Sequence, residues 1–236
     1  MSALVFDDVH AGYGPYKALN GLTLTIAEGE TVAVLGRNGV GKSTLARVAS
    51  GIVPVTGGHL EVLGRAVRRT APHVLARMGV VHLPEGVGLF SGLTVEENLI
   101  LRVGGTTRSQ RRERLARALD ALGALRGRRR SKAGQLSGGQ QRLVAVTAAL
   151  AAEPRLLLAD EPALGLAPRA ADEVYAQLEQ IRSSTSALVI IETRLARVEH
   201  LCARTVVLDK GVVAYDAKTS DAHEILQAML GGAGGG

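Results

Sequence analysis

A glycine-rich segment that directly follows an apolar run most limits what this 236-residue chain can fold into. Residues 31–35 (TVAVL) lead into residues 36–44 (GRNGVGKST), which match the pattern G-x-x-x-x-G-K-[ST]. In this pattern a strand, a turn of glycines and a helix N-terminus follow one another, so that backbone N–H groups can surround phosphate. The segment therefore predicts a site for a nucleoside triphosphate with Mg²⁺. Its expected contacts to nucleotide are Gly36, Asn38, Gly39, Gly41, Lys42, Ser43 and Thr44, with the Ser43 hydroxyl on the metal.

The composition fits one sizeable domain with an inserted lobe, since 46% of the residues are hydrophobic. No apolar run reaches the roughly 18 residues needed to cross a bilayer, and the N-terminus lacks the basic-then-apolar order of a signal peptide. We therefore expect an intracellular chain without a membrane span. Cys202 is the single cysteine, which leaves no internal disulfide framework, and we expect it to serve packing.

The positive charge is concentrated in one segment. Ten arginines and one lysine stand against Glu113 and Asp120 between Arg102 and Lys132, a net charge of +9 in a chain whose total is +6. Such a segment could meet nucleic acid, an anionic membrane surface or an acidic partner, or could be a solvated helix face. It holds no aromatic residue for base stacking, which argues against nucleic acid.

The pattern of apolar runs predicts an α/β fold with two kinds of strand. Alternating or short runs near the N-terminus suggest antiparallel pairing, whereas continuous apolar runs suggest parallel strands covered on both faces by helices. The first kind is expected at residues 3–6, 22–26, 32–35 and 59–62, and the second at residues 80–83, 155–159, 187–191 and 206–208. Between the strands at 80–83 and 155–159, helical spacing indicates an inserted helical lobe. We place the core at approximately 1–88 and 153–230, the helical subdomain at approximately 89–152, and a flexible tail at 231–236.

Two further motifs narrow the class of protein. The run Leu156 to Ala159 ends in Asp160 and Glu161, at the strand end where ligands of α/β sheets collect. Asp160 is suited to hold Mg²⁺, and Glu161 to polarise the water that attacks the γ-phosphorus. Residues 136–142 (LSGGQQR) form a Gly-Gly turn before an apolar helix, which is a second anion site. Because one nucleotide cannot occupy two distant helix N-termini of a small domain, this second site indicates a dimer with nucleotide between subunits.

With these motifs in this order, the chain resembles the nucleotide-binding subunits of ATP-binding-cassette transporters along nearly its whole length. The resemblance implies a P-loop NTPase core with a mainly parallel sheet, an antiparallel β subdomain and an inserted helical subdomain, all within a single domain over 1–236. It also implies a head-to-tail ATP sandwich and an adenine stacked on Tyr13. The residues that it implies for the nucleotide of the opposite subunit are Ser137, Gly138, Gly139 and Gln140.

Within that family, the chain looks most like the second ATPase of branched-chain and hydrophobic amino-acid importers. Residues 84–86 (PEG), 93–99 (LTVEENL) and 164–168 (LGLAP) are similar to that subgroup. Glu85 stands where most of the superfamily has a glutamine that contacts Mg²⁺ and the attacking water. Thr193 stands where the superfamily has a γ-phosphate histidine, and threonine is too short to replace it, so weakened hydrolysis is a hypothesis. Residues 87–89 (VGL) replace the subgroup's arginine, which leaves the membrane contacts and the substrate open.

The resemblance implies an ATPase that energises import through separate transmembrane permease subunits at the cytoplasmic face of the membrane. A second ATPase, paralogue or self, would complete the dimer, and a substrate-binding protein would take part indirectly. The alternatives are a related urea or amide importer, an exporter subunit, a non-hydrolysing ATP-gated subunit, and a soluble nucleic-acid-associated ATPase. The last of these usually has two cassettes or a long coiled insert, and neither is present here.

Overall fold

The computed structural model describes residues 1–86, 88–104, 107–181 and 187–230. Two parts of the sequence that we discussed above lie outside these described residues. They are Val87, the first of the residues 87–89 that replace the subgroup's arginine, and the expected flexible tail 231–236. Contacts divide the chain into two compact units. The first consists of Met1–His82, Arg155–Glu161 and Ser186–Gly236, and the second of Leu83–Pro154 and Pro162–Thr185. Each unit is described by itself below.

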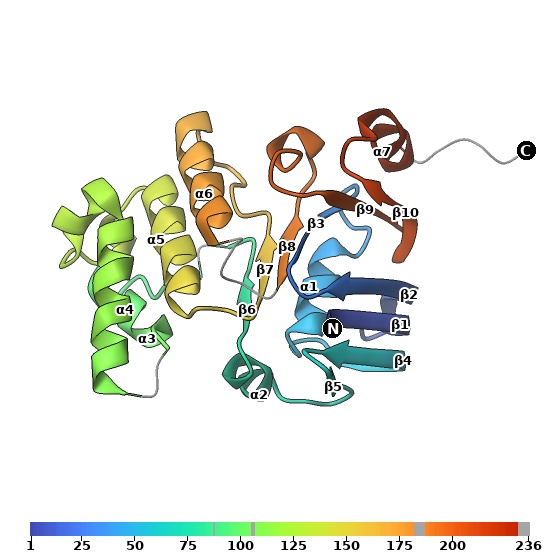
Figure 1. Cartoon of the computed structure of the whole chain (residues 1–236), viewed down its shortest axis with the longest axis horizontal. Coiled ribbons are helices and arrows are strands. Elements are labelled where there is room, and N and C mark those ends of the chain that lie inside the picture. Colours follow the sequence, from blue (N-terminus) through green and yellow to red (C-terminus); the bar gives the residue numbers. More distant parts are fainter. Residues whose placement is uncertain (87, 105–106, 182–186, 231–236) are drawn as a thin grey trace, which may run out of the picture. The chain divides into compact units, whose positions relative to one another are not determined.

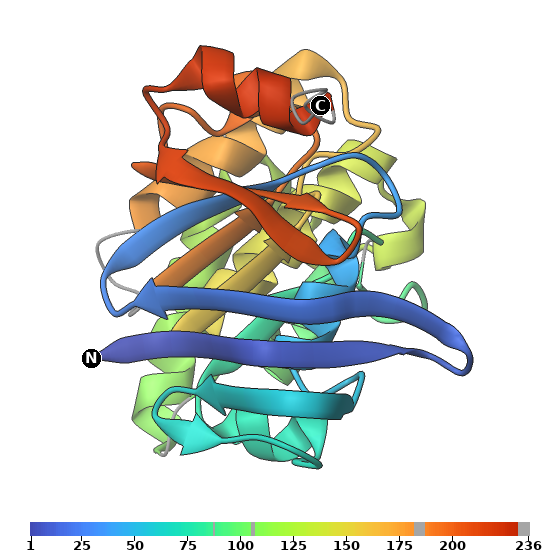
Figure 2. The same ribbon diagram turned by 90° about the vertical axis from the view of Figure 1, so that its right-hand side faces the viewer.

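The first unit begins with an antiparallel sheet of order β2-β1-β4-β5. Its strands are β1 (Ser2–Tyr13), β2 (Tyr16–Ala27), β4 (Val55–Val62) and β5 (Arg65–Ala66). Buried and exposed side chains alternate along β2 from Leu22 to Ala27, as expected for a sheet with one face on the core. In Figure 2, β1, β2 and β4 lie side by side as three long ribbons, with the N-terminus at the start of β1.

The same unit contains a six-stranded sheet of order β10-β9-β3-β8-β7-β6. Its strands are β3 (Glu30–Leu35), β6 (Val80–Leu83), β7 (Leu156–Asp160), β8 (Ala187–Ile191), β9 (Arg204–Asp209) and β10 (Val212–Lys218). The pairs β3–β8, β3–β9 and β7–β8 are parallel, and β10 is antiparallel to its neighbour β9. Strand β3, expected among the short N-terminal runs, therefore belongs to the parallel group. Every residue of β7 and β8 is buried, which explains why these strands are continuous apolar runs in the sequence.

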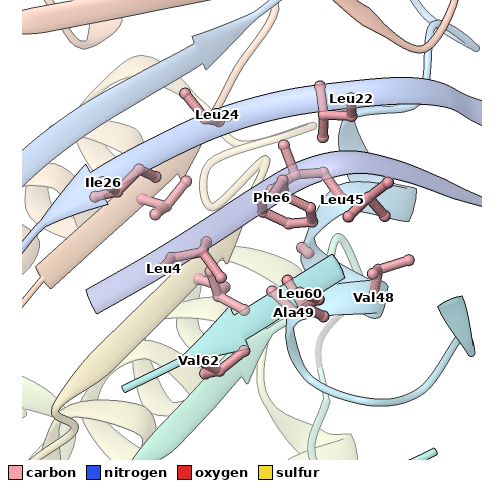
Figure 3. Close-up of a cluster of buried hydrophobic side chains, with 14 of the residues drawn as sticks. Leu4, Phe6, Leu22, Leu24, Ile26, Leu45, Val48, Ala49, Leu60 and Val62 are labelled. Atoms are coloured by element: carbon pink, nitrogen blue, oxygen red, sulfur yellow. The ribbon is translucent and has the colours of Figure 1, made fainter. Parts of the chain in front are cut away.

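Helix α1 (Lys42–Ala49) follows β3 and contacts both sheets. Leu45, Val48 and Ala49 on α1 meet side chains of β1, β2 and β4 in one buried cluster (Figure 3). Phe6, at the centre of this cluster, is fully buried. Burying a leucine or phenylalanine side chain contributes about 1.5–3 kcal/mol. The cluster therefore fixes the helix that begins at the phosphate-loop motif. Two further helices of this unit are α2 (Pro72–Arg77) and α7 (Ala222–Met229).

The second unit is helical. It contains α3 (Val95–Arg102), α4 (Arg108–Ala121), α5 (Gly138–Ala151) and α6 (Pro168–Ile181), with 3₁₀ turns at Gly123–Arg128 and Ala133–Gln135. The first three begin at capping boxes, in which the side chains of Thr94, Thr107 and Ser137 each accept from the backbone N–H three residues later. Helices α4 and α6 both pack against α5, and the three lie side by side in Figure 1. Our sequence-based boundaries assign α6 to the core, whereas its contacts group it with these helices.

The predicted fold class is confirmed: a mainly parallel sheet, an antiparallel β subdomain and a set of inserted helices are all present. In the described part of the chain, no helix is both long enough and apolar enough to cross a membrane.

Candidate nucleotide-binding site

The phosphate-loop motif lies between β3 and α1, and its backbone can be built only with glycine at two positions. Gly36 has φ 148° and Gly41 has φ 109°. A Cβ on Gly36 would lie 2.5 Å from the carbonyl oxygen of Leu208, and one on Gly41 would lie 2.6 Å from that of Ala18. Real Cβ atoms do not approach carbonyl oxygens so closely, so both positions need glycine for their backbone conformation and for space.

The N-terminus of α1 is open to an anion. Gly41 is the N-cap residue and supplies no side-chain oxygen to the first N–H groups of the helix. Lys42 is 5% exposed, and its Nζ donates to the carbonyl oxygens of Gly36 at 2.8 Å and Arg37 at 3.0 Å. The ammonium group is therefore held over the loop, within the concavity that the motif forms.

The strand ends beside this loop form one edge. The register pairs Val34 of β3 with Ile191 of β8, and Ile191 with Asp160 of β7. The C-terminal ends of these three parallel strands therefore lie at the same edge of the sheet. Ser43 Oγ donates to Asp160 Oδ1 at 3.1 Å, although 117 positions separate the two residues. Asp160 is 1% exposed. The structure thus brings together Ser43 and Asp160, two of the three residues that we expected to contact Mg²⁺.

Glu161 follows Asp160 in an unusual conformation. Its φ is 44°, in the left-handed region that residues other than glycine rarely adopt. Its N–H donates to the carbonyl oxygen of Ile191 at 3.0 Å, which ties the turn to the end of β8. Such a conformation costs about 1–3 kcal/mol and is common at functional sites. The residue with this strained backbone is the expected general base, and it directly follows the expected metal ligand Asp160.

Thr193 lies two residues beyond β8, at the same edge. Its N–H donates to Glu192 Oε2 at 3.0 Å, and its side chain is half-buried. Glu192 is fully buried, and Arg197 lies 3.5 Å from its Oε1. The charged Glu192 therefore holds the backbone at Thr193, which positions a short hydroxyl side chain where a phosphate contact was expected.

Tyr13 and Tyr16 face each other across the β1–β2 turn. Tyr13 is 42% exposed, and its hydroxyl accepts from Arg47 of α1 at 2.9 Å. Tyr16 is missing from our sequence-based site, yet its hydroxyl lies 3.4 Å from the carbonyl oxygen of Gly39. It lines a pocket of about 320 Å³ together with Asn38 and Gly39. The sequence signal for Tyr16 was its position three residues from Tyr13, in a chain with only 3% aromatic residues.

The second unit holds the other expected site residues. Ser137 Oγ accepts from the N–H of Gln140 at 3.4 Å, and the Gln140 side chain accepts from the N–H of Ser137 at 3.2 Å. These contacts start α5 and place Gly138 and Gly139 in its first turn. Ser137 and Gly138 are exposed. The N-terminus of α5 is therefore accessible from outside this unit.

Arg142 is a residue of this unit that our sequence reasoning missed. It is 3% exposed on α5, and its guanidinium donates to the carbonyl oxygens of Pro84 at 2.7 Å, Pro162 at 2.5 Å and Gly86. Two of these carbonyls flank Glu85, whose own side chain is exposed. Arg142 thus ties the Glu85 segment to the helix that begins at Ser137. A charged residue at the start of an otherwise apolar helix is the sequence signal that could have found it, because buried charge requires partners.

His82 on β6 lies against the far end of α1. Its Nδ1 is 3.4 Å from Ser50 Oγ, and within the described residues its buried Nε2 has no hydrogen-bond partner. Burial, together with the positive charge of Arg47, lowers the pKa of His82 from 6.5 to about 4. The histidine is therefore neutral around pH 7 and packs as part of the support for the phosphate-loop helix.

The donor set fits a magnesium ion bound together with nucleotide. Mg²⁺ prefers oxygen ligands and usually takes one or two carboxylates plus substrate phosphates. Ser43 and Asp160 supply a hydroxyl and a carboxylate in contact with each other. The described residues include no group of three His, Cys, Asp or Glu that could hold a metal without such help. The remaining ligands would have to come from phosphate and water.

Comparison with known proteins shows the family of this chain. The family model described as ABC transporter matches residues 19–164. The chain is 33% identical to the high-affinity branched-chain amino acid transport ATP-binding protein BraG of Pseudomonas aeruginosa, over 97% of this chain and 100% of that protein. It is 30% identical to the probable branched-chain amino acid transport ATP-binding protein LivF of Archaeoglobus fulgidus, over 93% of this chain and 92% of that protein. Among solved structures, it resembles a dimeric ATP-binding cassette in a post-hydrolysis state bound to ADP and Pi. That match has a TM-score of 0.80 and 25% identity, and covers 92% of this chain and 98% of the other.

Proposed function

The chain belongs to the ABC transporter family as an ATP-binding and ATP-hydrolysing subunit, and from this premise we propose that it energises the import of a branched-chain or other hydrophobic amino acid. The observation that carries the proposal is the end-to-end similarity to two ATP-binding proteins of branched-chain amino acid transport. Both alignments span more than nine-tenths of this chain and of the relative, so the similarity is not confined to the motifs that every cassette needs.

The working form that we propose is a head-to-tail dimer that drives transmembrane permease subunits from the cytoplasmic face of the membrane. The phosphate loop and the turn at residues 137–140 belong to different units, and each presents a helix N-terminus suited to phosphate. The exposure of Ser137 and Gly138 supports a role toward the nucleotide of a second subunit. That subunit is a paralogous ATPase or a second copy of this chain.

Each side chain of the site has a proposed task in hydrolysis. Lys42 binds the β- and γ-phosphates, and Ser43 and Asp160 hold Mg²⁺, which would neutralise charge on the transferred phosphoryl group. Glu161 orients the attacking water and accepts its proton. Tyr13 stacks on adenine, and Glu85 would contact the attacking water and the metal.

Thr193 leads us to propose slow hydrolysis at this subunit's own site. A threonine hydroxyl ends closer to the backbone than an imidazole nitrogen would, and the Thr193 backbone is held by Glu192. A contact to the γ-phosphate that strengthens in the transition state is therefore weakened. A heterodimer would compensate for this, because a partner that carries a longer side chain would supply a faster second site.

Two measurements test the proposal. The first is the MgATP hydrolysis rate of the purified chain across protein concentrations, with Glu161→Gln as the blank. We expect the rate per subunit to rise with concentration, because two subunits build each site, and Glu161→Gln to bind ATP tightly while accumulating as a dimer. A rate per subunit independent of concentration, or a monomeric Glu161→Gln variant with bound ATP, would contradict a sandwich built from two copies of this chain.

The second measurement is uptake of radiolabelled leucine by cells that carry either the wild-type chain or Glu161→Gln in place of it, with radiolabelled urea as the control substrate. We expect leucine uptake to fall to background with Glu161→Gln and urea uptake to be unchanged. Loss of urea uptake with intact leucine uptake would reject the amino-acid assignment while leaving the ATPase mechanism standing.

A further inference from the structure

The helical unit contains a pocket that none of the nucleotide-site residues lines. It has a volume of about 400 Å³ and lies among α4, α5 and α6, within a single unit. Pockets that hold small molecules usually measure about 300–1,000 Å³. Its lining residues from α4 are Arg114, Arg117, Ala118 and Ala121, those from α5 are Thr147, Leu150 and Ala151, and the others are Glu153, Pro154, Gln177 and Gln180.

The charged groups of this pocket carry a net positive charge. Arg114 Nη2 lies 2.5 Å from Glu153 Oε2, and Arg117 Nη2 lies 2.6 Å from Glu153 Oε1. A guanidinium has five N–H donors, and the recorded ion pairs use one nitrogen of each arginine. Two cations thus share one carboxylate and keep further donors for a second anion. The side chain of Arg114 is 23% exposed, so part of this charge is shielded from water.

The remaining polar groups deeper in the pocket are engaged with the protein. Thr147 Oγ1 donates to Gln177 Oε1 at 3.1 Å and lies 2.9 Å from the carbonyl oxygen of Leu143, while Gln177 Nε2 donates to the carbonyl oxygen of Ala121 at 3.3 Å. The rest of the wall consists of Leu150, Pro154, the small alanine side chains and the exposed Gln180. A ligand would therefore find charge complementarity at the arginines and apolar contact elsewhere.

We propose that this pocket binds a small organic carboxylate, with its carboxylate on Arg114 and Arg117 and a short apolar tail along Leu150 and the alanines of α4. A monoanion matches the net charge of the cluster, and the apolar part of the wall favours a ligand with an apolar tail over a sugar or free phosphate. The pocket would make the helical unit a sensor of metabolite level. This inference does not depend on which molecule is transported.

Isothermal titration calorimetry on the full chain tests the proposal with 4-methylpentanoate as the probe. The neutral amide 4-methylpentanamide has the same shape and no charge, and inorganic phosphate has charge and no tail. We expect one molecule of 4-methylpentanoate to bind per chain, and at least tenfold weaker binding of the amide and of phosphate. No binding of 4-methylpentanoate, or equal binding of either control, would overturn the proposal.

Charge variants of the cluster give a second, two-directional test. Arg117→Gln removes one guanidinium and should weaken 4-methylpentanoate binding about tenfold, whereas Glu153→Gln removes the competing carboxylate and should tighten it several-fold. Arg112→Gln is the matched control, since Arg112 lies exposed on the same helix and does not line the pocket. It should change binding less than twofold. An equal loss in Arg112→Gln and Arg117→Gln would show a diffuse charge effect, and weaker binding in Glu153→Gln would show that its carboxylate does not compete with the ligand. Either result would reject the site.

Discussion

Acid should destabilise this protein through His82, a residue outside the nucleotide site. His82 packs on β6 against the end of α1, with Arg47 close enough to disfavour the imidazolium. Burial and this charge lower its pKa from 6.5 to about 4 in the folded protein. Between these two pKa values, His82 is protonated in the unfolded chain and neutral in the folded protein. The stability associated with neutral His82 is therefore fully present above pH 6.5 and is lost as the pH falls toward 4.

The size of the loss follows from these two pKa values. At pH 5 the unfolded chain holds nearly one proton on His82, whereas the folded protein holds about a tenth of one. Linkage then gives a loss of about 2 kcal/mol in the free energy of unfolding between pH 8 and pH 5 from this group alone. For a domain of this size, that corresponds to a fall of about 4–8 °C in melting temperature.

Thermal denaturation of the wild type and of His82→Leu at pH 8 and pH 5 measures this contribution. Leucine has a similar volume and does not leave Ser50 unpaired, because Ser50 Oγ also donates to the carbonyl oxygen of Ala46 at 2.8 Å. Protonation of carboxylates lowers both melting temperatures equally, so the difference between the two proteins isolates His82. His200→Leu, which removes an exposed histidine, is the control and should keep the wild-type response. An equal pH response in the wild type and in His82→Leu would refute the reasoning.

Three further substitutions test the nucleotide site and its support. Lys42→Ala removes the buried ammonium over the loop and should weaken ATP binding at least tenfold in equilibrium titration; unchanged affinity would show that the lysine does not reach the phosphates. Thr193→His should raise the turnover of the assembled ATPase severalfold, and an unchanged rate would remove the hypothesis of a weakened site. Arg142→Met leaves the carbonyl oxygens of Pro84 and Pro162 without their donor and should lower the free energy of unfolding by about 3 kcal/mol, which corresponds to a melting temperature lower by about 6–12 °C. The control Arg130→Met removes an exposed arginine and should melt like the wild type. Equal melting of both variants would contradict the anchoring role of Arg142.

The sequence predicted the bounds of two strands of the six-stranded sheet. Strand β8 agrees with the expected Ala187–Ile191, because a strand covered on both sides needs an apolar residue at every position. Strand β6 agrees with the expected Val80–Leu83, although its two middle residues are only half-buried. Strand β1 was expected over residues 3–6 and extends to Tyr13. Its second half contains polar residues and is defined by pairing with β2 and β4, which a local pattern does not reveal.

Other features depend on contacts between distant residues and were not predictable from local patterns. Strand β10 lies at an edge and alternates exposed and half-buried residues, so it carries no continuous apolar run. Helix α6 follows a core strand in the sequence but packs on α5, and nothing in its own residues identifies that partner. The role of Arg142 depends on three carbonyl groups up to 58 positions away. The residue type alone does not show which groups a buried arginine contacts.

The two parts of the proposed site are held in place by different means, and this bears on how they respond to mutation. In the first unit, Ser43, Asp160 and Glu161 lie at the ends of paired parallel strands, where backbone register fixes their positions. In the second unit, the Glu85 segment is held by the side chain of Arg142, and Ser137 by its capping box with Gln140. Arg142→Met should therefore preserve ATP binding by the isolated chain, since the phosphate loop is untouched, while lowering the concentration-dependent hydrolysis that requires both parts. Loss of ATP binding in this variant would mean that the first unit is not organised independently.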